Sequence, residues 1–95
     1  MANVSRSVVV GSRVGLHARP AKLVAQEAAR QPVIVRIAKN GGDPVDARSL
    51  LSLLALGAKQ GDAVTLSADG DGAEAALGVI ASLVEQDLDE EPADA

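Results

Sequence analysis

Four short stretches of the chain alternate apolar and polar residues with a period of two, which is typical of half-buried strands. In the first stretch, Val4, Val8 and Val10 share one face, and Val9 lies on the other. Pro44 lies within the third stretch and predicts an edge strand, because proline cannot donate a ladder hydrogen bond. The four predicted strands are residues 4–10, 33–39, 43–47 and 63–68.

A different period predicts a helix over residues 18–30, where apolar residues recur every three to four positions. Pro20 fits only near the start of such a helix, where its missing N–H is no loss. His17, the only histidine of the chain, is therefore expected at or beside the N-cap. The stripe that faces the core consists of Ala21, Val24, Ala25 and Ala28.

Two further helices are predicted in the second half of the chain. Residues 49–56 form a short apolar helix, with Ser49 as its N-cap and Gly57 at its end. Asp71 and Glu74 have the spacing of a capping box and open a final helix. Its apolar stripe consists of Ala73, Ala76, Leu77, Ile80 and Val84.

These elements follow one another in the order βαββαβα, which favours four strands in one antiparallel sheet covered on one face by helices. The predicted fold class is therefore a two-layer α+β architecture. A chain of 95 residues is long enough for one core and for no second domain. We expect one domain over residues 1–87, followed by an acidic, disordered tail over residues 88–95.

The composition argues against several classes of function. No Phe, Tyr or Trp is present to stack on bases, so a nucleic-acid partner is not expected. No cysteine is present and no further ligand accompanies His17, so neither a metal site nor a cofactor is expected. No apolar run is long enough to cross a bilayer, so we expect a cytoplasmic protein without membrane insertion.

The net charge of −4 is unevenly distributed along the chain. Residues 1–48 hold eight bases and three acids, whereas residues 49–95 hold one base and ten acids. His17 lies in the basic half, and a positive face there would meet an anion and an acidic partner protein. A solvated surface without a partner explains the same charges, so both interpretations stay open.

The segment from Gly15 to Ala21 carries the residues best suited to chemistry. The neutral imidazole of His17 is a nitrogen nucleophile at physiological pH. A helix N-terminus presents backbone N–H groups and a positive dipole end to an anion, here expected at Ala18 and Arg19. The Arg19 guanidinium adds a planar, permanently charged partner for phosphate. These residues predict a histidine that accepts and passes on a phosphoryl group, with catalysis supplied by partner proteins.

The short helix after Ser49 carries four leucines, Leu50, Leu51, Leu53 and Leu54, which cannot all lie on one side. About half of this apolar surface is expected to face outwards and to serve as a docking patch. The alternative is that all four leucines belong to the core, which is a serious competitor in a chain without aromatic residues.

Residues 15–21 resemble the active-site motif of HPr, the histidine phosphocarrier family of the bacterial phosphoenolpyruvate:sugar phosphotransferase system. Residues 48–51, followed by Leu56 and Gly57, resemble the helix that carries the regulatory serine of that family. The resemblance covers about residues 1–87. It implies an open-faced β-sandwich with strand order 1-4-2-3 and three helices on one face.

By this resemblance, His17 takes a phosphoryl group on Nδ1 from phosphorylated Enzyme I and passes it to sugar-specific IIA domains. Arg19 assists at the phosphoryl group, and the chain is not an enzyme in its own right. Ser49 corresponds to the serine that HPr kinase/phosphorylase modifies in many Gram-positive bacteria. The docking surface implied for partner proteins consists of Ala18, Lys22, Leu50, Leu51 and Leu54.

Other functions stay open. A relative with the same fold could serve a nitrogen-regulatory or dihydroxyacetone-kinase phosphorelay. A regulatory docking module could use the leucines without carrying phosphate, although the intact His17 and Arg19 argue against it. A small hydrolase is disfavoured, because no nucleophile–base pair accompanies His17.

Overall fold

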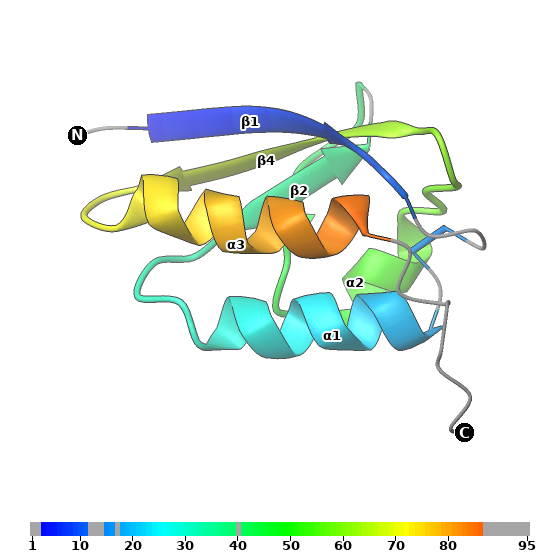
Figure 1. Cartoon of the computed structure of the whole chain (residues 1–95), viewed down its shortest axis with the longest axis horizontal. Coiled ribbons are helices and arrows are strands. Elements are labelled where there is room, and N and C mark those ends of the chain that lie inside the picture. The colour runs from blue at the N-terminus through cyan, green and yellow to red at the C-terminus, as the bar shows by residue number, and fades with distance from the viewer. Residues whose placement is uncertain (1–2, 12–14, 17, 40, 87–95) are drawn as a thin grey trace.

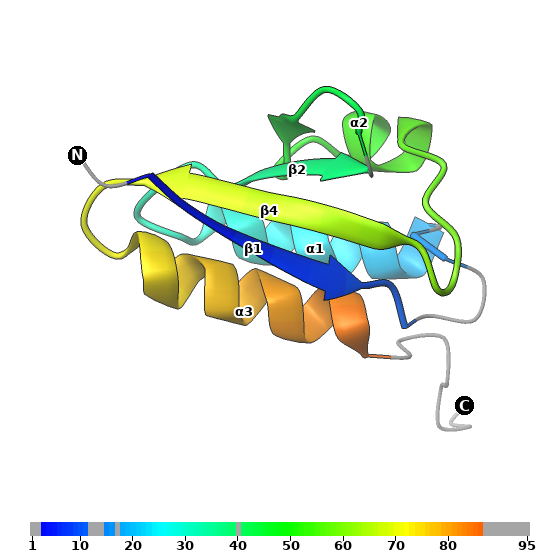
Figure 2. The same cartoon turned by 90° about the horizontal axis from the view of Figure 1, so that it is seen from above.

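The computed structural model describes residues 3–11, 15–16, 18–39 and 41–86, and its elements follow the predicted order. Figure 1 shows a sheet packed on a layer of helices, and Figure 2 shows the two layers from above. The strands are β1 (Asn3–Val9), β2 (Arg36–Lys39), β3 (Val45–Asp46) and β4 (Ala63–Asp69). The helices are α1 (Ala18–Ala29), α2 (Leu50–Ala55) and α3 (Ala73–Glu85). The predicted tail over residues 88–95 lies outside the described residues.

The four strands form one antiparallel sheet in the order β1-β4-β2-β3, which confirms the order that the resemblance implied. β1 pairs with β4 along its whole length. β3 is a short edge strand, and Pro44 lies directly before it, where its missing N–H costs no ladder hydrogen bond. The strand predicted over residues 43–47 is therefore only two residues long.

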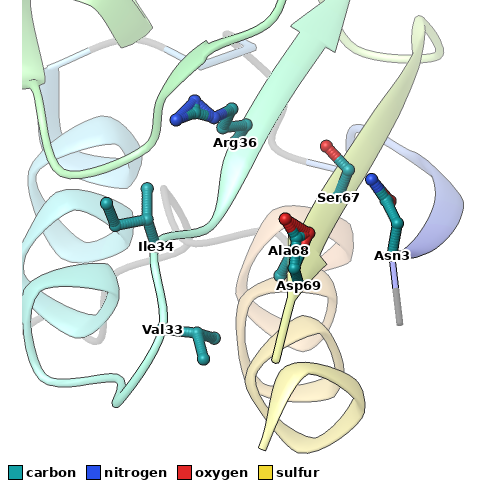
Figure 3. A pocket seen from close by; sticks show the side chains of 7 residues that line it. All are labelled: Asn3, Val33, Ile34, Arg36, Ser67, Ala68 and Asp69. Atoms are coloured by element: carbon teal, nitrogen blue, oxygen red, sulfur yellow. The ribbon is translucent and has the colours of Figure 1, made fainter. Parts of the chain in front are cut away.

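β2 is also shorter than predicted, because it begins at Arg36 and not at residue 33. Its ladder with β4 covers only Arg36 to Lys39. Before Arg36 the chain separates from β4, and a cleft of about 280 Å³ opens between them. Figure 3 shows Ile34 on one side of this cleft and Ser67 on the other.

The core lies between the sheet and the helix layer and consists of aliphatic side chains. Inward-facing Val8, Val64 and Leu66 come from β1 and β4, and they are buried. The predicted stripes of α1 and α3 are buried as well, except that Ala25 is only partly buried. The helices cover one face of the sheet and leave the other face open, as Figure 2 shows. The largest fully buried side chains are Ile37, Leu53, Leu66, Leu77 and Ile80.

The capping box predicted for α3 is wrong. The helix begins at Ala73, and its N-cap is Gly72, not Asp71. Gly72 has a φ of +87°, a left-handed conformation that glycine adopts without strain, and no described side chain caps the helix there. A Cβ at Gly72 would lie 3.1 Å from Cγ of Pro32, so this close approach also favours glycine. Glu74 remains in the first turn, where its charge suits the helix dipole.

Candidate functional site

The N-terminal end of α1 presents the residues that the sequence motif singles out. α1 begins at Ala18, and Ala18, Arg19 and Lys22 are exposed. Pro20 is the third helical residue and is buried, so among the first three residues only Ala18 and Arg19 have an N–H. His17 lies outside the described residues, and the sequence places it directly before Ala18. The first turn of α1 therefore contains two backbone N–H groups and a cationic side chain directly after the only histidine of the sequence.

Gly15 holds the segment before α1 against another part of the chain. Its φ is +78°, and a Cβ here would clash with the carbonyl oxygen of Ala58 and lie 2.8 Å from Cα of Lys59. Only glycine meets both conditions, because other residues rarely adopt this φ and would need that space. Leu16 is buried and donates its N–H to the Ala58 carbonyl at 3.0 Å. The chain thus enters α1 from a fixed point.

Further hydrogen bonds tie the same part of the chain to residues 57–62, which we call the 57–62 loop. These bonds are Val10 N–H to Asp62 O at 3.0 Å, Gly61 N–H to Val10 O at 2.9 Å and Gln60 Nε2 to Gly11 O at 3.2 Å. Both ends of the segment that leads into α1 are therefore attached to one loop. This contact between the 57–62 loop and the segment before α1 was not predicted from the sequence. The only local signal in the sequence is the pair of glycines, Gly57 and Gly61, and both have a positive φ in the structure.

α2 lies beside the N-terminal end of α1, as Figures 1 and 2 both show. Leu53 is fully buried in the core, whereas Leu50, Leu51 and Leu54 are 40%, 77% and 38% exposed. The interpretation that all four leucines belong to the core is therefore wrong. We call Leu50, Leu51 and Leu54 the leucine patch.

Ser49 is the N-cap of α2, as predicted. Its backbone is extended, and its Oγ accepts the N–H of Ser52 at 3.2 Å. The side chain is half-buried. At the other end of α2, Gly57 adopts a φ of +65° and lets the chain leave the helix towards Ala58. α2 thus runs from the predicted regulatory serine to the loop that contacts Gly15.

Asp46 and Arg48 form an ion pair directly before Ser49. The Arg48 guanidinium donates from Nη2 to Oδ2 of Asp46 at 2.7 Å and from Nε to Oδ1 at 3.0 Å. The backbone N–H of Arg48 also donates to Oδ1, at 2.9 Å. The guanidinium hydrogen bonds, the backbone N–H and the charges of Arg48 and Arg36 outweigh partial burial and lower the pKa of Asp46 below its ordinary value of 3.8. The pair stays charged at neutral pH and braces the turn into α2.

The cleft beside Arg36 is a weaker candidate site. It lies at the opposite end of the fold from the start of α1, and Figure 3 shows Arg36 extending away from Ser67. Its polar side chains therefore do not converge on one point, as a small-ligand site requires. No three His, Cys, Asp or Glu side chains among the described residues are placed to hold a metal ion. In the same part of the chain, no helix is long and apolar enough to cross a membrane.

Comparison with known proteins identifies the family. The family model described as the PTS HPr component phosphorylation site matches residues 4–86. The chain belongs to the HPr family. Several relatives, among them one that is 48% identical, are named phosphocarrier proteins, and this chain is a phosphocarrier and not an enzyme with its own turnover.

The similarities extend over the whole described fold. The phosphocarrier protein HPr of Streptomyces coelicolor is 48% identical over 87 residues, which is 92% of this chain and 94% of the relative. The HPr-like protein Crh of Bacillus subtilis is 38% identical over 85 residues, 90% of this chain and 99% of the relative. The crystal structure of a phosphocarrier protein HPr from Bacillus anthracis superposes with a TM-score of 0.83 at 37% identity, covering 88% of this chain and 99% of that chain. These similarities confirm the predicted fold class.

We predict that Gly15→Ala destabilises the protein more than Gly41→Ala does. Gly41 is a matched control, because its φ of +77° is nearly the same as the φ of +78° at Gly15, so alanine meets the same backbone strain at both positions. At Gly41, however, no described atom lies within 4 Å of the added Cβ. The control is expected to cost about 1–2 kcal/mol for the left-handed conformation alone. Gly15→Ala adds a backbone clash and breaks the Leu16–Ala58 hydrogen bond. Urea unfolding and hydrogen exchange at Leu16 measure both effects, and equal costs for the two variants would refute the close approach.

We also predict that the Asp46–Arg48 pair loses its effect on stability in acid. The folded pKa of Asp46 lies below its unfolded value, so the contribution is fully present above about pH 4 and is lost as the pH falls through the folded pKa. Asp46→Asn is expected to lower the free energy of unfolding by about 1 kcal/mol or less at pH 7, since the pair is partly exposed. Urea titrations from pH 7 to below the folded pKa test this. If the difference in free energy of unfolding between the wild type and Asp46→Asn stayed constant over that pH range, the prediction would be contradicted.

Proposed function

We propose that His17 accepts a phosphoryl group on Nδ1 from phosphorylated Enzyme I and passes it to the IIA domains of sugar-specific transporters. One observation carries this proposal: the chain has a single histidine, and it lies within the matched residues 4–86, directly before α1. The matching family model is described as a phosphorylation site, and His17 is the only imidazole on which a phosphohistidine can form here. We place this transfer in the cytoplasm of a bacterium, as a step of sugar uptake.

The transfer exchanges one bond to phosphorus for another. The unprotonated ring nitrogen of His17 attacks phosphorus, and the new N–P bond forms as the bond to the donor group breaks. The displaced donor group takes up the proton that the imidazole ring releases. The N–H groups of Ala18 and Arg19 and the dipole of α1 stabilise the charge on the phosphoryl oxygens. The Arg19 guanidinium contributes a further positive charge to the same oxygens.

The leucine patch, together with Ala18 and Lys22, forms the surface that docks Enzyme I and the IIA domains. α2 packs beside α1, so the apolar patch borders the end of α1 that follows His17. Leu51 is 77% exposed and adds little to the core, whereas its burial under a partner would contribute to binding. Lys22 on the exposed side of α1 favours a partner with an acidic surface.

Ser49 is the proposed site of regulation by HPr kinase/phosphorylase. A phosphate on its Oγ would add nearly two negative charges at the N-terminal end of α2, which that helix end tolerates. The same charges would lie next to the leucine patch, because Leu50 and Leu51 follow Ser49 directly. An apolar docking surface with an added dianion binds its partners more weakly, so modification of Ser49 is expected to slow phosphoryl transfer.

Intact-mass spectrometry after incubation with phosphoenolpyruvate and purified Enzyme I tests the assignment of His17. We expect the mass of one phosphoryl group to be added to the wild type, to be lost in mild acid, and to be absent in His17→Ala. Acid lability separates phosphohistidine from a phosphoserine at Ser49. No addition with an active Enzyme I would overturn the proposal and would favour another donor or a docking module.

A charge in the leucine patch is expected to weaken docking without removing the chemistry. We predict that Leu51→Glu raises the KM of Enzyme I for this carrier about tenfold or more, because an exposed apolar anchor is replaced by a carboxylate. Val79→Glu is the matched control, since Val79 is 39% exposed on α3, outside the patch. Steady-state kinetics with Enzyme I measure both variants. Similar KM values for Leu51→Glu and the wild type would exclude the patch from the docking surface.

A further inference from the structure

An ion pair between β2 and the 57–62 loop has no part in the proposed mechanism. Oδ2 of Asp62 accepts the N–H of Lys59 at 2.8 Å, and Nζ of Lys39 lies 3.6 Å from the same oxygen. Lys39 also donates from Nζ to the carbonyl of Gly57 at 3.3 Å. Because Lys39 ends β2, the pair connects the sheet to the loop that contacts Gly15.

The Asp62 carboxylate binds the same peptide group that Leu16 binds from the other side. The N–H of Lys59 and the carbonyl of Ala58 belong to the same peptide group. Asp62 holds this group by its N–H, and Leu16 binds its oxygen at 3.0 Å. An anion at the N–H of an amide polarises the group and makes its oxygen a stronger acceptor. The charge of Asp62 is thereby relayed to the N–H of Leu16, the residue directly before His17.

The surroundings of Asp62 keep its carboxyl group ionised. The hydrogen bond from Lys59 is the main cause that lowers the pKa of Asp62 below its ordinary value of 3.8. Partial burial opposes this effect, and the charges of Lys39 and Lys59 add to it. The side chains of Lys39 and Asp62 are 40% and 35% exposed, and ion pairs of this kind contribute little to global stability. The main effect that we expect of the pair is therefore to fix the position of the 57–62 loop.

We propose that Lys39 and Asp62 are positioning residues for phosphoryl transfer, which hold the Ala58 carbonyl in place for Leu16. The inference rests on the proposed role of His17. Lys39 binds the peptide group between Gly57 and Ala58, and Asp62 binds the one between Ala58 and Lys59. The two peptide groups that flank Ala58 are therefore both held by side chains. Phosphoryl transfer depends on the reacting nitrogen and the N–H groups of α1 being correctly placed, and small displacements lower the rate.

Asp62→Asn removes the charge but keeps the size of the side chain and an oxygen that can accept the Lys59 N–H. We expect kcat for phosphoryl transfer from Enzyme I to fall about fivefold with KM unchanged, because the leucine patch is not altered. The Leu16 amide proton is expected to shift to higher field and to exchange about fivefold faster, because its acceptor is weaker. Lys39→Met is also expected to lower kcat, because it removes the charge and the donor. Lys39→Arg keeps both and is expected to have the kcat of the wild type.

Asp46→Asn is the matched control. The Asp46 carboxylate also accepts a backbone N–H and pairs with a cation, yet none of the described hydrogen bonds of its turn reaches Gly15 or Leu16. We expect kcat and the Leu16 amide of this variant to match the wild type. Wild-type kcat and wild-type Leu16 exchange in Asp62→Asn, or equal losses in both variants, would overturn the inference. A wild type that is never phosphorylated would instead overturn the proposed function itself.

Discussion

The residues directly before His17 are held in place by a contact between two stretches of backbone. Gly15 lies so close to the peptide group between Ala58 and Lys59 that no Cβ fits between them. Leu16 is buried beside this contact, and its N–H is bonded to the Ala58 carbonyl. A contact between backbones tolerates less variation than one between side chains, which can change rotamer. The chain is therefore held at a defined point at Leu16, the residue directly before His17 in the sequence.

The sheet explains why these two stretches meet. β1 and β4 pair along their whole length, with Val9 opposite Ala63 at the end where β1 stops and β4 begins. The segment that leads into α1 and the 57–62 loop therefore leave the sheet side by side. Val10 continues the pairing by exchanging hydrogen bonds with the loop, and its side chain is buried in the core. The register of one strand pair thus positions the site, and the aliphatic core beneath maintains that register.

Local features of the sequence predicted most of this fold. The periods of two and of about 3.6 residues predict the strands and helices, and the motif at residues 15–21 predicts the site at the start of α1. The errors lie where the outcome depends on residues far away in the chain. Gly72 replaces Asp71 as N-cap beside the distant Pro32, and β2 shortens because the chain before Arg36 leaves β4. The role of Gly15 is of the same kind, since its partner Ala58 is known only once the strands are paired.

α2 connects the leucine patch, where partners are proposed to dock, to the 57–62 loop, which holds the segment before His17. Its first end carries Ser49 beside the leucine patch, and its last end leads through Gly57 to the Ala58 carbonyl. A charge at Ser49 could therefore act on partner docking or on the placement of the 57–62 loop. The second route requires α2 to move, yet Leu53 is fully buried and Lys39 binds the carbonyl of Gly57. We infer that a phosphate at Ser49 would act on the docking surface and leave the geometry before His17 unchanged.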